Sequence, residues 1–114
     1  MTIEELRIRI DALDRQLVEL LSERARAAQM IGNLKAATSL PVYEPDREKI
    51  IYANVRAANK GPLPDIELTH IYERIIDVMR ALQRNELASQ RSAQAAQAEG
   101  NAAGAQTPET GKKQ

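Results

Sequence analysis

The sequence contains no cysteine, no tryptophan and no phenylalanine, with only three tyrosines and one histidine. Without cysteine there is no disulfide framework and no thiolate metal site. The single histidine, His70, does not indicate a histidine-based metal site or a histidine pair in catalysis, and we expect it at the surface. The core must be built from Leu, Ile, Val, Met and Ala, which suit helix–helix packing at least as well as a sheet.

Several functional classes also lack their signals. No run of about 18 apolar residues is present, so no membrane span is expected, and the first residues lack the pattern of a signal peptide. The net charge of zero argues against a nucleic-acid partner bound through bulk charge. No glycine-rich phosphate loop or nucleophile elbow is found. We expect a cytoplasmic protein that needs no metal, cofactor or covalent intermediate.

One long helix is predicted for the first third of the chain, from about Thr2 to Ala37. Thr2 and Glu5 have the spacing of a capping box, and no proline interrupts the segment after them. Gly32 disfavours a helix by about 1 kcal/mol relative to alanine without ending it; the alternative is two shorter helices with a break near Gly32. The apolar residues that recur with the helical period are Ile3, Leu6, Ile10, Leu13, Leu17, Leu20 and Leu21.

Two further helices are predicted, over Pro45–Asn59 and Asp65–Leu87, separated by a strong stop signal at residues 59–62. Residues 88–114 contain no Leu, Ile, Val or Met, and we expect a disordered tail, whose Ala and Gln residues could extend the last helix by a turn or two. The fold class is therefore all-α: a three-helix domain over residues 1–87, with a very long N-terminal helix.

The length of the first helix predicts a homodimer. It would measure about 54 Å, whereas a compact domain of this size has a radius of gyration of about 12 Å. Its apolar face would extend beyond anything that the two shorter helices can cover. A second copy of the chain is the simplest cover, because two-fold dimers are the commonest oligomers.

Arg24 and Lys35 interrupt this apolar face. Arg24 falls at the heptad position of Ile10 and Leu17, and Lys35 returns to within about 20° of Arg24 around the helix, about 16 Å further along. A buried cation needs an anionic partner, which is either a bound anion or a carboxylate in a salt bridge. Otherwise its charged end has to reach solvent. Two cations on one face favour the bound anion.

Other polar residues are candidates on weaker grounds. Arg7 lies near the edge of the same face, too far from Lys35 to share a site within one chain. It would reach a partner's site in an antiparallel dimer, or simply lie in solvent. Arg47 lies on the inward row of the second helix, while Glu48 also suits a helix start for dipole reasons. Gln83 falls on the apolar face of the third helix, where it would serve as a ligand-binding group or an interhelical hydrogen bonder.

Three segments together resemble the all-helical class of chorismate mutases: LRIRIDALDRQLVELLSERARAAQMIGNLK, PVYEPDRE and IIDVMRALQ. The resemblance covers about residues 3–87, in order and with fitting spacings. It implies an intertwined homodimer with two active sites, each built from both chains. It also implies the substrate chorismate, a dicarboxylate that is rearranged to prephenate in phenylalanine and tyrosine biosynthesis.

The resemblance also implies roles in binding the two carboxylates. Arg7 would reach one of them from the partner chain, while Arg24 would bind a carboxylate in its own chain's site, with Arg47 nearby. Met79 stands where family members often carry serine near a carboxylate, so a polar contact is lost there.

The remaining implied roles concern the reacting oxygen and the ring. Lys35 and Gln83 would donate hydrogen bonds to the ether oxygen, on which negative charge builds as its bond to carbon breaks. Glu48 would accept a hydrogen bond from the ring hydroxyl, and Glu44 would lie near the same hydroxyl.

Two alternatives stay open. One is a lyase that removes pyruvate from isochorismate on the same scaffold. The other is a non-catalytic helical dimerisation or regulatory module, in which the cations pair with Glu44 or Glu48. Association with another shikimate-pathway enzyme is compatible with each of these interpretations.

Overall fold

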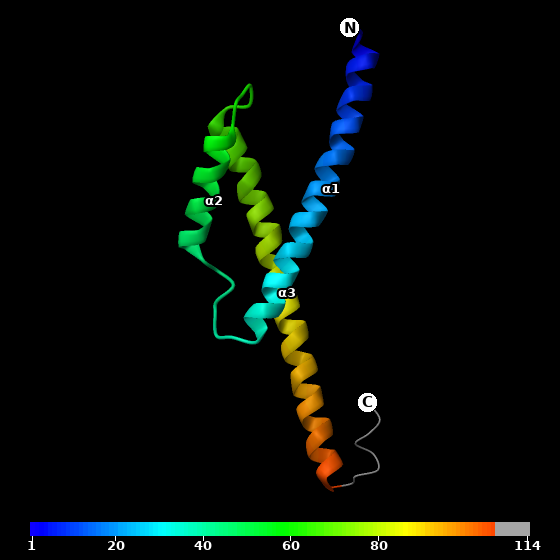
Figure 1. Ribbon diagram of the computed structural model, residues 1–114, viewed down its shortest axis with the longest axis vertical. Coiled ribbons are helices and arrows are strands. Elements are labelled where there is room, and N and C mark those ends of the chain that lie inside the picture. The colour runs from blue at the N-terminus through cyan, green and yellow to red at the C-terminus, as the bar shows by residue number, and fades with distance from the viewer. Residues whose placement is uncertain (107–114) are drawn as a thin grey trace.

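The computed structural model describes residues 1–106, and the side chains of residues 1–100, as three helices in an open arrangement. Helix α1 covers Ile3–Ala36, α2 covers Pro45–Ala58 and α3 covers Asp65–Gln106. Helix α3 packs against both of the others, crossing α1 near the end of α1 and running beside α2 (Figure 1). The all-α prediction with one very long N-terminal helix is confirmed.

Each helix begins where the sequence places a start signal. The Thr2 hydroxyl accepts a hydrogen bond from the Glu5 amide at 3.1 Å, and the Glu5 carboxylate accepts one from the Thr2 amide at 3.0 Å. This is the predicted capping box. Pro45 occupies the first turn of α2, where its missing amide hydrogen costs nothing. The turn before α3 is tied by Asn59, whose side-chain amide donates to the Asp65 carboxylate at 2.7 Å.

Helix α1 is continuous through Gly32, so the alternative of a break there is wrong. The glycine instead permits a close crossing. A Cβ atom at this position would lie 3.0 Å from the backbone oxygen of Gln83 and 3.0 Å from the Glu86 Cβ. The absence of a side chain at Gly32 therefore sets how near α3 comes to α1, and it brings Gln83 toward the last turns of α1.

Helix α3 continues well past Leu87, whereas the sequence predicts a disordered tail from residue 88. That expectation rests on the lack of large apolar residues, which limits packing but not helix formation. Residues 88–106 contain eight Ala and four Gln, and both residue types have high helix propensity. Residues 107–114, which the same expectation covers, lie outside the described part of the chain.

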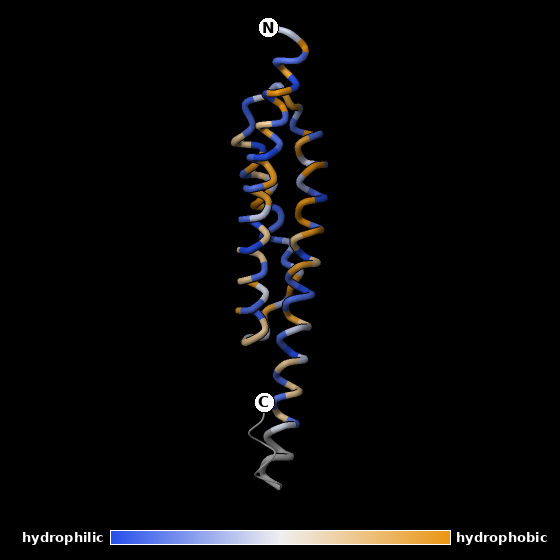
Figure 2. Tube along the Cα trace, turned by 90° about the vertical axis from the view of Figure 1, so that its right-hand side faces the viewer, coloured by the Kyte–Doolittle hydropathy of each residue, from blue (hydrophilic) through white to orange (hydrophobic). Residues whose placement is uncertain are grey.

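The chain has little core of its own. Its radius of gyration is 21.3 Å, well above the roughly 12 Å of a compact domain of about 90 residues. The buried apolar side chains among the described residues are Ala28, Ile76 and Met79. Apolar residues recur along both long helices instead of gathering in one place (Figure 2). None of the helices in the described part of the chain has the length and apolarity needed to cross a membrane.

Candidate active site

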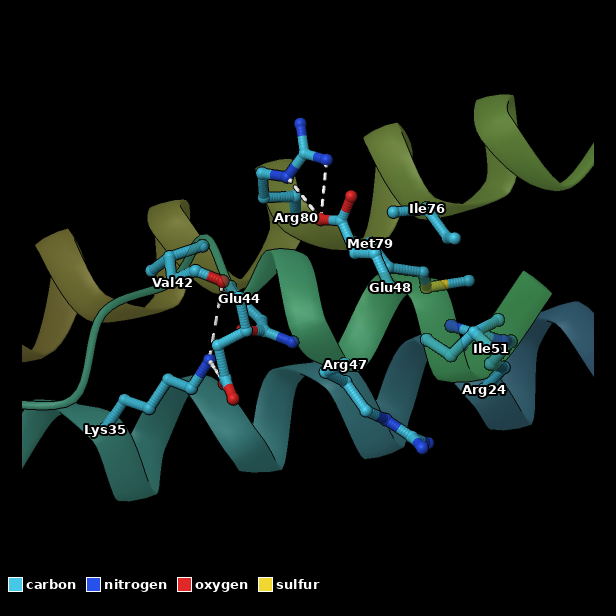
Figure 3. A pocket seen from close by; sticks show the side chains of 11 residues that line it. Arg24, Lys35, Val42, Glu44, Arg47, Glu48, Ile51, Ile76, Met79 and Arg80 are labelled. Atoms are coloured by element: carbon cyan, nitrogen blue, oxygen red, sulfur yellow. Dashed lines mark hydrogen bonds and ion pairs between the residues drawn. The ribbon is translucent and has the colours of Figure 1, made fainter. Parts of the chain in front are cut away.

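A small cavity lies where the end of α1, the start of α2 and the middle of α3 meet (Figure 3). It has a volume of about 80 Å³ and adjoins a wider space of about 490 Å³. The polar and charged residues that line both spaces are Arg24, Lys35, Glu44, Arg47 and Gln83. Charged groups of both signs and an amide therefore surround one opening between the three helices.

Lys35 is at the centre of the hydrogen bonding in this cavity. Only 4% of the residue is exposed, and its Nζ forms an ion pair with Glu44 at 2.5 Å (Figure 3). The same Nζ donates to the Gln83 Oε1 at 3.1 Å and to the Val42 carbonyl at 3.4 Å. The ammonium group thus has three oxygen partners, of which only the Glu44 carboxylate carries a charge. The partner most exposed to solvent is the Glu44 carboxylate, whose side chain is 46% exposed.

The two arginines that line the cavity from α1 and α2 differ from Lys35 in having no polar partner within residues 1–100. Neither Arg24 nor Arg47 forms an ion pair or a side-chain hydrogen bond within residues 1–100. Arg24 is half-buried, so its guanidinium gives up part of its hydration without gaining a carboxylate. Two guanidinium groups at one cavity suit an anion that offers planar, two-oxygen acceptors, such as a carboxylate.

Gln83 and Met79 contribute to the cavity from α3. Because the Gln83 Oε1 accepts from Lys35, its amide nitrogen remains as a donor. Met79 is buried and, with Ile51 and Ile76, forms the apolar part of the lining. The cavity thus combines donors and cations on one side with an apolar wall on another.

Glu48 is anchored by a residue that the sequence did not single out. The Arg80 guanidinium donates two hydrogen bonds to the Glu48 Oε2, at 2.6 and 3.2 Å (Figure 3). These hydrogen bonds raise the pKa of Arg80, and the negative charges of Glu48 and Asp77 act in the same direction. The pair links the first turn of α2 to the middle of α3, at the lining of the cavity.

Arg7 is the one predicted site residue that the chain does not bring to the cavity. Its side chain is 71% exposed, on the part of α1 that leads away from the other two helices (Figure 1). Its ion pair is with Glu4, one turn earlier, at 3.9 Å. His70 is exposed near the start of α3, as predicted, and pairs with Glu67 at 3.4 Å.

Sequence reasoning missed four residues of the lining: Val42, Ile51, Ile76 and Arg80. Arg80 carried a signal that could have been used. It lies four residues after Ile76 and three before Gln83, the spacing of one helical face. Among the described residues, no group of three or more potential ligands could hold a metal ion.

Fold and cavity together define an all-helical domain with a cavity lined by charged side chains, and comparison with known proteins places that domain in a family. The family model for chorismate mutase type II matches residues 6–84, so this chain belongs to the chorismate mutase type II family.

Solved structures with the same fold include two chorismate mutases. One is form II of the Thermus thermophilus protein, at 36% identity and a TM-score of 0.70, covering 72% of this chain and 93% of that one. The other is the Helicobacter pylori protein in complex with prephenate, at 34% identity and a TM-score of 0.68, covering 75% of this chain and 93% of that one.

The bifunctional chorismate mutase/prephenate dehydratase of Aquifex aeolicus is 37% identical over 86 residues, which is 72% of this chain. This chain spans 24% of that protein's length. The likeness therefore concerns one part of a longer relative.

Proposed function

We propose that this protein is a chorismate mutase, which rearranges chorismate to prephenate in the cytoplasm on the route to phenylalanine and tyrosine. Membership of the family supports the proposal, as does the similar Helicobacter pylori structure, which contains prephenate. The observation that carries the proposal is that four side chains surround one cavity. Arg24 and Arg47 have no carboxylate partners within residues 1–100, and Lys35 and Gln83 supply hydrogen-bond donors.

In this reaction the protein forms no covalent bond with the substrate. A carbon–oxygen bond breaks and a carbon–carbon bond forms within one molecule, so neither a nucleophile nor a proton transfer is required. The protein must hold the flexible diacid in its folded, reactive conformation, and it must stabilise the charge that builds on the ether oxygen. In this proposal Arg24 and Arg47 bind carboxylates, while Lys35 and the Gln83 amide donate to the ether oxygen.

Substrate binding then requires one change in the site. Lys35 is surrounded by three oxygen partners, and one of them has to move before Lys35 can donate to the ether oxygen. Glu44 is the partner to be released, because its carboxylate is part-exposed and can regain hydration. Once displaced, it lies near the ring hydroxyl, where Glu48 also accepts a hydrogen bond. Met79 supplies apolar contact in place of a polar one.

We further propose that the working unit is a homodimer. Large apolar side chains along α1 are at least 39% exposed in the single chain: Ile3, Leu6, Ile10, Leu13, Leu17, Leu20 and Leu21. Covering this face with the same face of a second chain removes these apolar side chains from water. An antiparallel pairing also carries the exposed Arg7 of each chain toward the partner's cavity, where it binds a substrate carboxylate.

A steady-state assay with purified protein tests the proposed reaction. We expect the absorbance of chorismate to fall and prephenate to be the product. Incubation with isochorismate tests the lyase alternative, and release of pyruvate would favour it. The Lys35–Glu44 ion pair is the observation that favours a non-catalytic module. Stable chorismate in the presence of a folded dimer would support that interpretation and overturn the mutase.

A further inference from the structure

Arg80 is held from three directions between α2, α3 and the connection that precedes α2. Its Nη2 and Nε donate to Glu48, its Nη1 donates to the Asp77 carboxylate at 3.4 Å, and its guanidinium lies 5.1 Å from the centre of the Tyr43 ring. A guanidinium with this many contacts has one preferred position, since each contact restricts a different part of the group.

The two hydrogen bonds to Glu48 converge on one oxygen. Both reach Oε2, and the Glu48 Oε1 accepts no hydrogen bond within residues 1–100. The Glu48 side chain is 17% exposed and belongs to the lining of the cavity. One oxygen of this carboxylate is therefore anchored, and the other keeps its capacity to accept a hydrogen bond from a ligand.

We propose that Arg80 is a positioning residue for substrate recognition: it fixes Oε2 of Glu48 so that Oε1 is oriented to accept the ring hydroxyl of the substrate. This inference rests on the proposed function, and it adds a residue to the site through Glu48. Arg80 does not itself touch the substrate. A carboxylate held in advance loses less side-chain freedom on binding, so the anchor strengthens binding of the hydroxyl.

An ion pair that merely joins α2 to α3 would predict something different. Its loss would lower the stability of the fold without a selective effect on substrate affinity. Positioning of Glu48 predicts a rise in KM with a smaller change in kcat, because a hydroxyl contact made equally in the ground state and the transition state is uniform binding. It also predicts that replacing Arg80 does not change KM further once the Glu48 carboxylate has been removed.

The test compares Arg80→Met, Glu48→Ala and the double variant with the wild-type chain, by chorismate kinetics and thermal unfolding. We expect Arg80→Met to raise KM about tenfold with kcat within about twofold, the effect of losing a charged hydrogen-bond partner. The double variant should have the KM of Glu48→Ala alone. Arg84→Met, one turn further along α3 and exposed, is the matched control and should behave as wild type.

Arg80→Lys keeps the charge and can donate to Glu48, but it lacks the planar fork of the guanidinium, so its KM should lie between those of wild type and Arg80→Met. This variant decides the matter if Arg80→Met does not fold. An unchanged KM in a folded Arg80 variant, or additive effects in the double variant, would overturn the role of Arg80 while wild-type turnover still supports the mutase. Absence of wild-type turnover would overturn both proposals.

Discussion

At the scale of the residue, Lys35 is the charged side chain that is buried among residues 1–100. It is a buried cation that donates hydrogen bonds to two neutral oxygens and forms an ion pair with Glu44. Such a group is expensive to leave without partners, yet a ligand has to compete for it. In the proposed reaction, Lys35 stabilises the charge that builds on the ether oxygen.

Replacement of Lys35 by alanine should therefore lower kcat/KM by two to three orders of magnitude, because one preorganised donor to a developing negative charge contributes roughly 3–4 kcal/mol. Steady-state kinetics measure the loss, and Lys49→Ala, on the exposed part of α2, is the control. Wild-type turnover in a Lys35→Ala variant would refute the assignment.

Gln83 gives a prediction with a pH signature. The variant Gln83→Glu places a carboxyl at the same position, and a carboxyl donates a hydrogen bond only when it is protonated. Its activity should rise as pH falls from 8 toward 5, approaching the ordinary glutamate pKa of about 4.3. Comparison of kcat/KM across this range with the wild-type profile measures the effect. A profile as flat as that of the wild type would count against Gln83 as the donor.

Some site residues could be predicted because they break the apolar pattern of a helix, whereas others are set by contacts that have no sequence pattern. Arg24 and Lys35 could be predicted because charge on an apolar helical face is conspicuous, and both line the cavity. Arg80 shares the helical face of Ile76 and Gln83, but its pairing with Glu48 depends on how α2 packs against α3, which the sequence does not show. The Lys35–Glu44 pair within one chain depends on the path of residues 37–44, whose backbone has no repeating pattern.

At the scale of the element, the first two helices and the start of the third were predictable to within one residue, because each boundary has a cap, a proline or a stop signal. The end of α3 was not. Its last third has helix-forming residues but no apolar face, so hydrophobic periodicity does not mark where the helix ends.

The crossing of α1 and α3 supplies a prediction at this scale. Alanine at position 32 favours an isolated helix by about 1 kcal/mol, yet its Cβ would press on the Gln83 backbone. Because a backbone oxygen cannot rotate away, α3 has to shift and carry Gln83 away from Lys35. We expect Gly32→Ala to lower kcat/KM at least tenfold, a barrier change of about 1.4 kcal/mol.

Thermal unfolding measured beside the kinetics separates the local shift from a general loss of structure. Ala36→Gly, one turn later in α1, serves as a control for helix propensity alone. A Gly32→Ala variant that is more stable and fully active would show that the crossing tolerates a methyl group.

At the scale of the whole molecule, the single chain is 73 × 34 × 15 Å and leaves most of its large apolar side chains exposed. The family and the helical fold, both predicted from the sequence, are confirmed. The shared active site of a dimer stays a prediction, since it depends on where the partner's Arg7 lies.

Mixed dimers test that sharing directly. Arg7→Ala and Lys35→Ala subunits should each be weakly active alone. When the two are unfolded together and refolded, half of the dimers are mixed and each contains one intact site, so about a quarter of wild-type activity should return. Activity no greater than the average of the two parents would show that Arg7 and Lys35 do not serve the same site across the dimer.

Helix α1 carries Arg7 near one end and Arg24 and Lys35 toward the other, and in the proposed dimer these belong to different catalytic centres. A single inserted residue between positions 7 and 24 would rotate Arg7 by about 100° relative to Arg24 and shift it by about 1.5 Å. Substitution of one solvent-facing residue for another between positions 7 and 24 leaves the orientation of Arg7 relative to Arg24 unchanged. The segment between positions 7 and 24 should therefore accept many sequences but only one length. Deletion of a single residue there should inactivate both catalytic centres of the dimer, although the deleted residue belongs to neither.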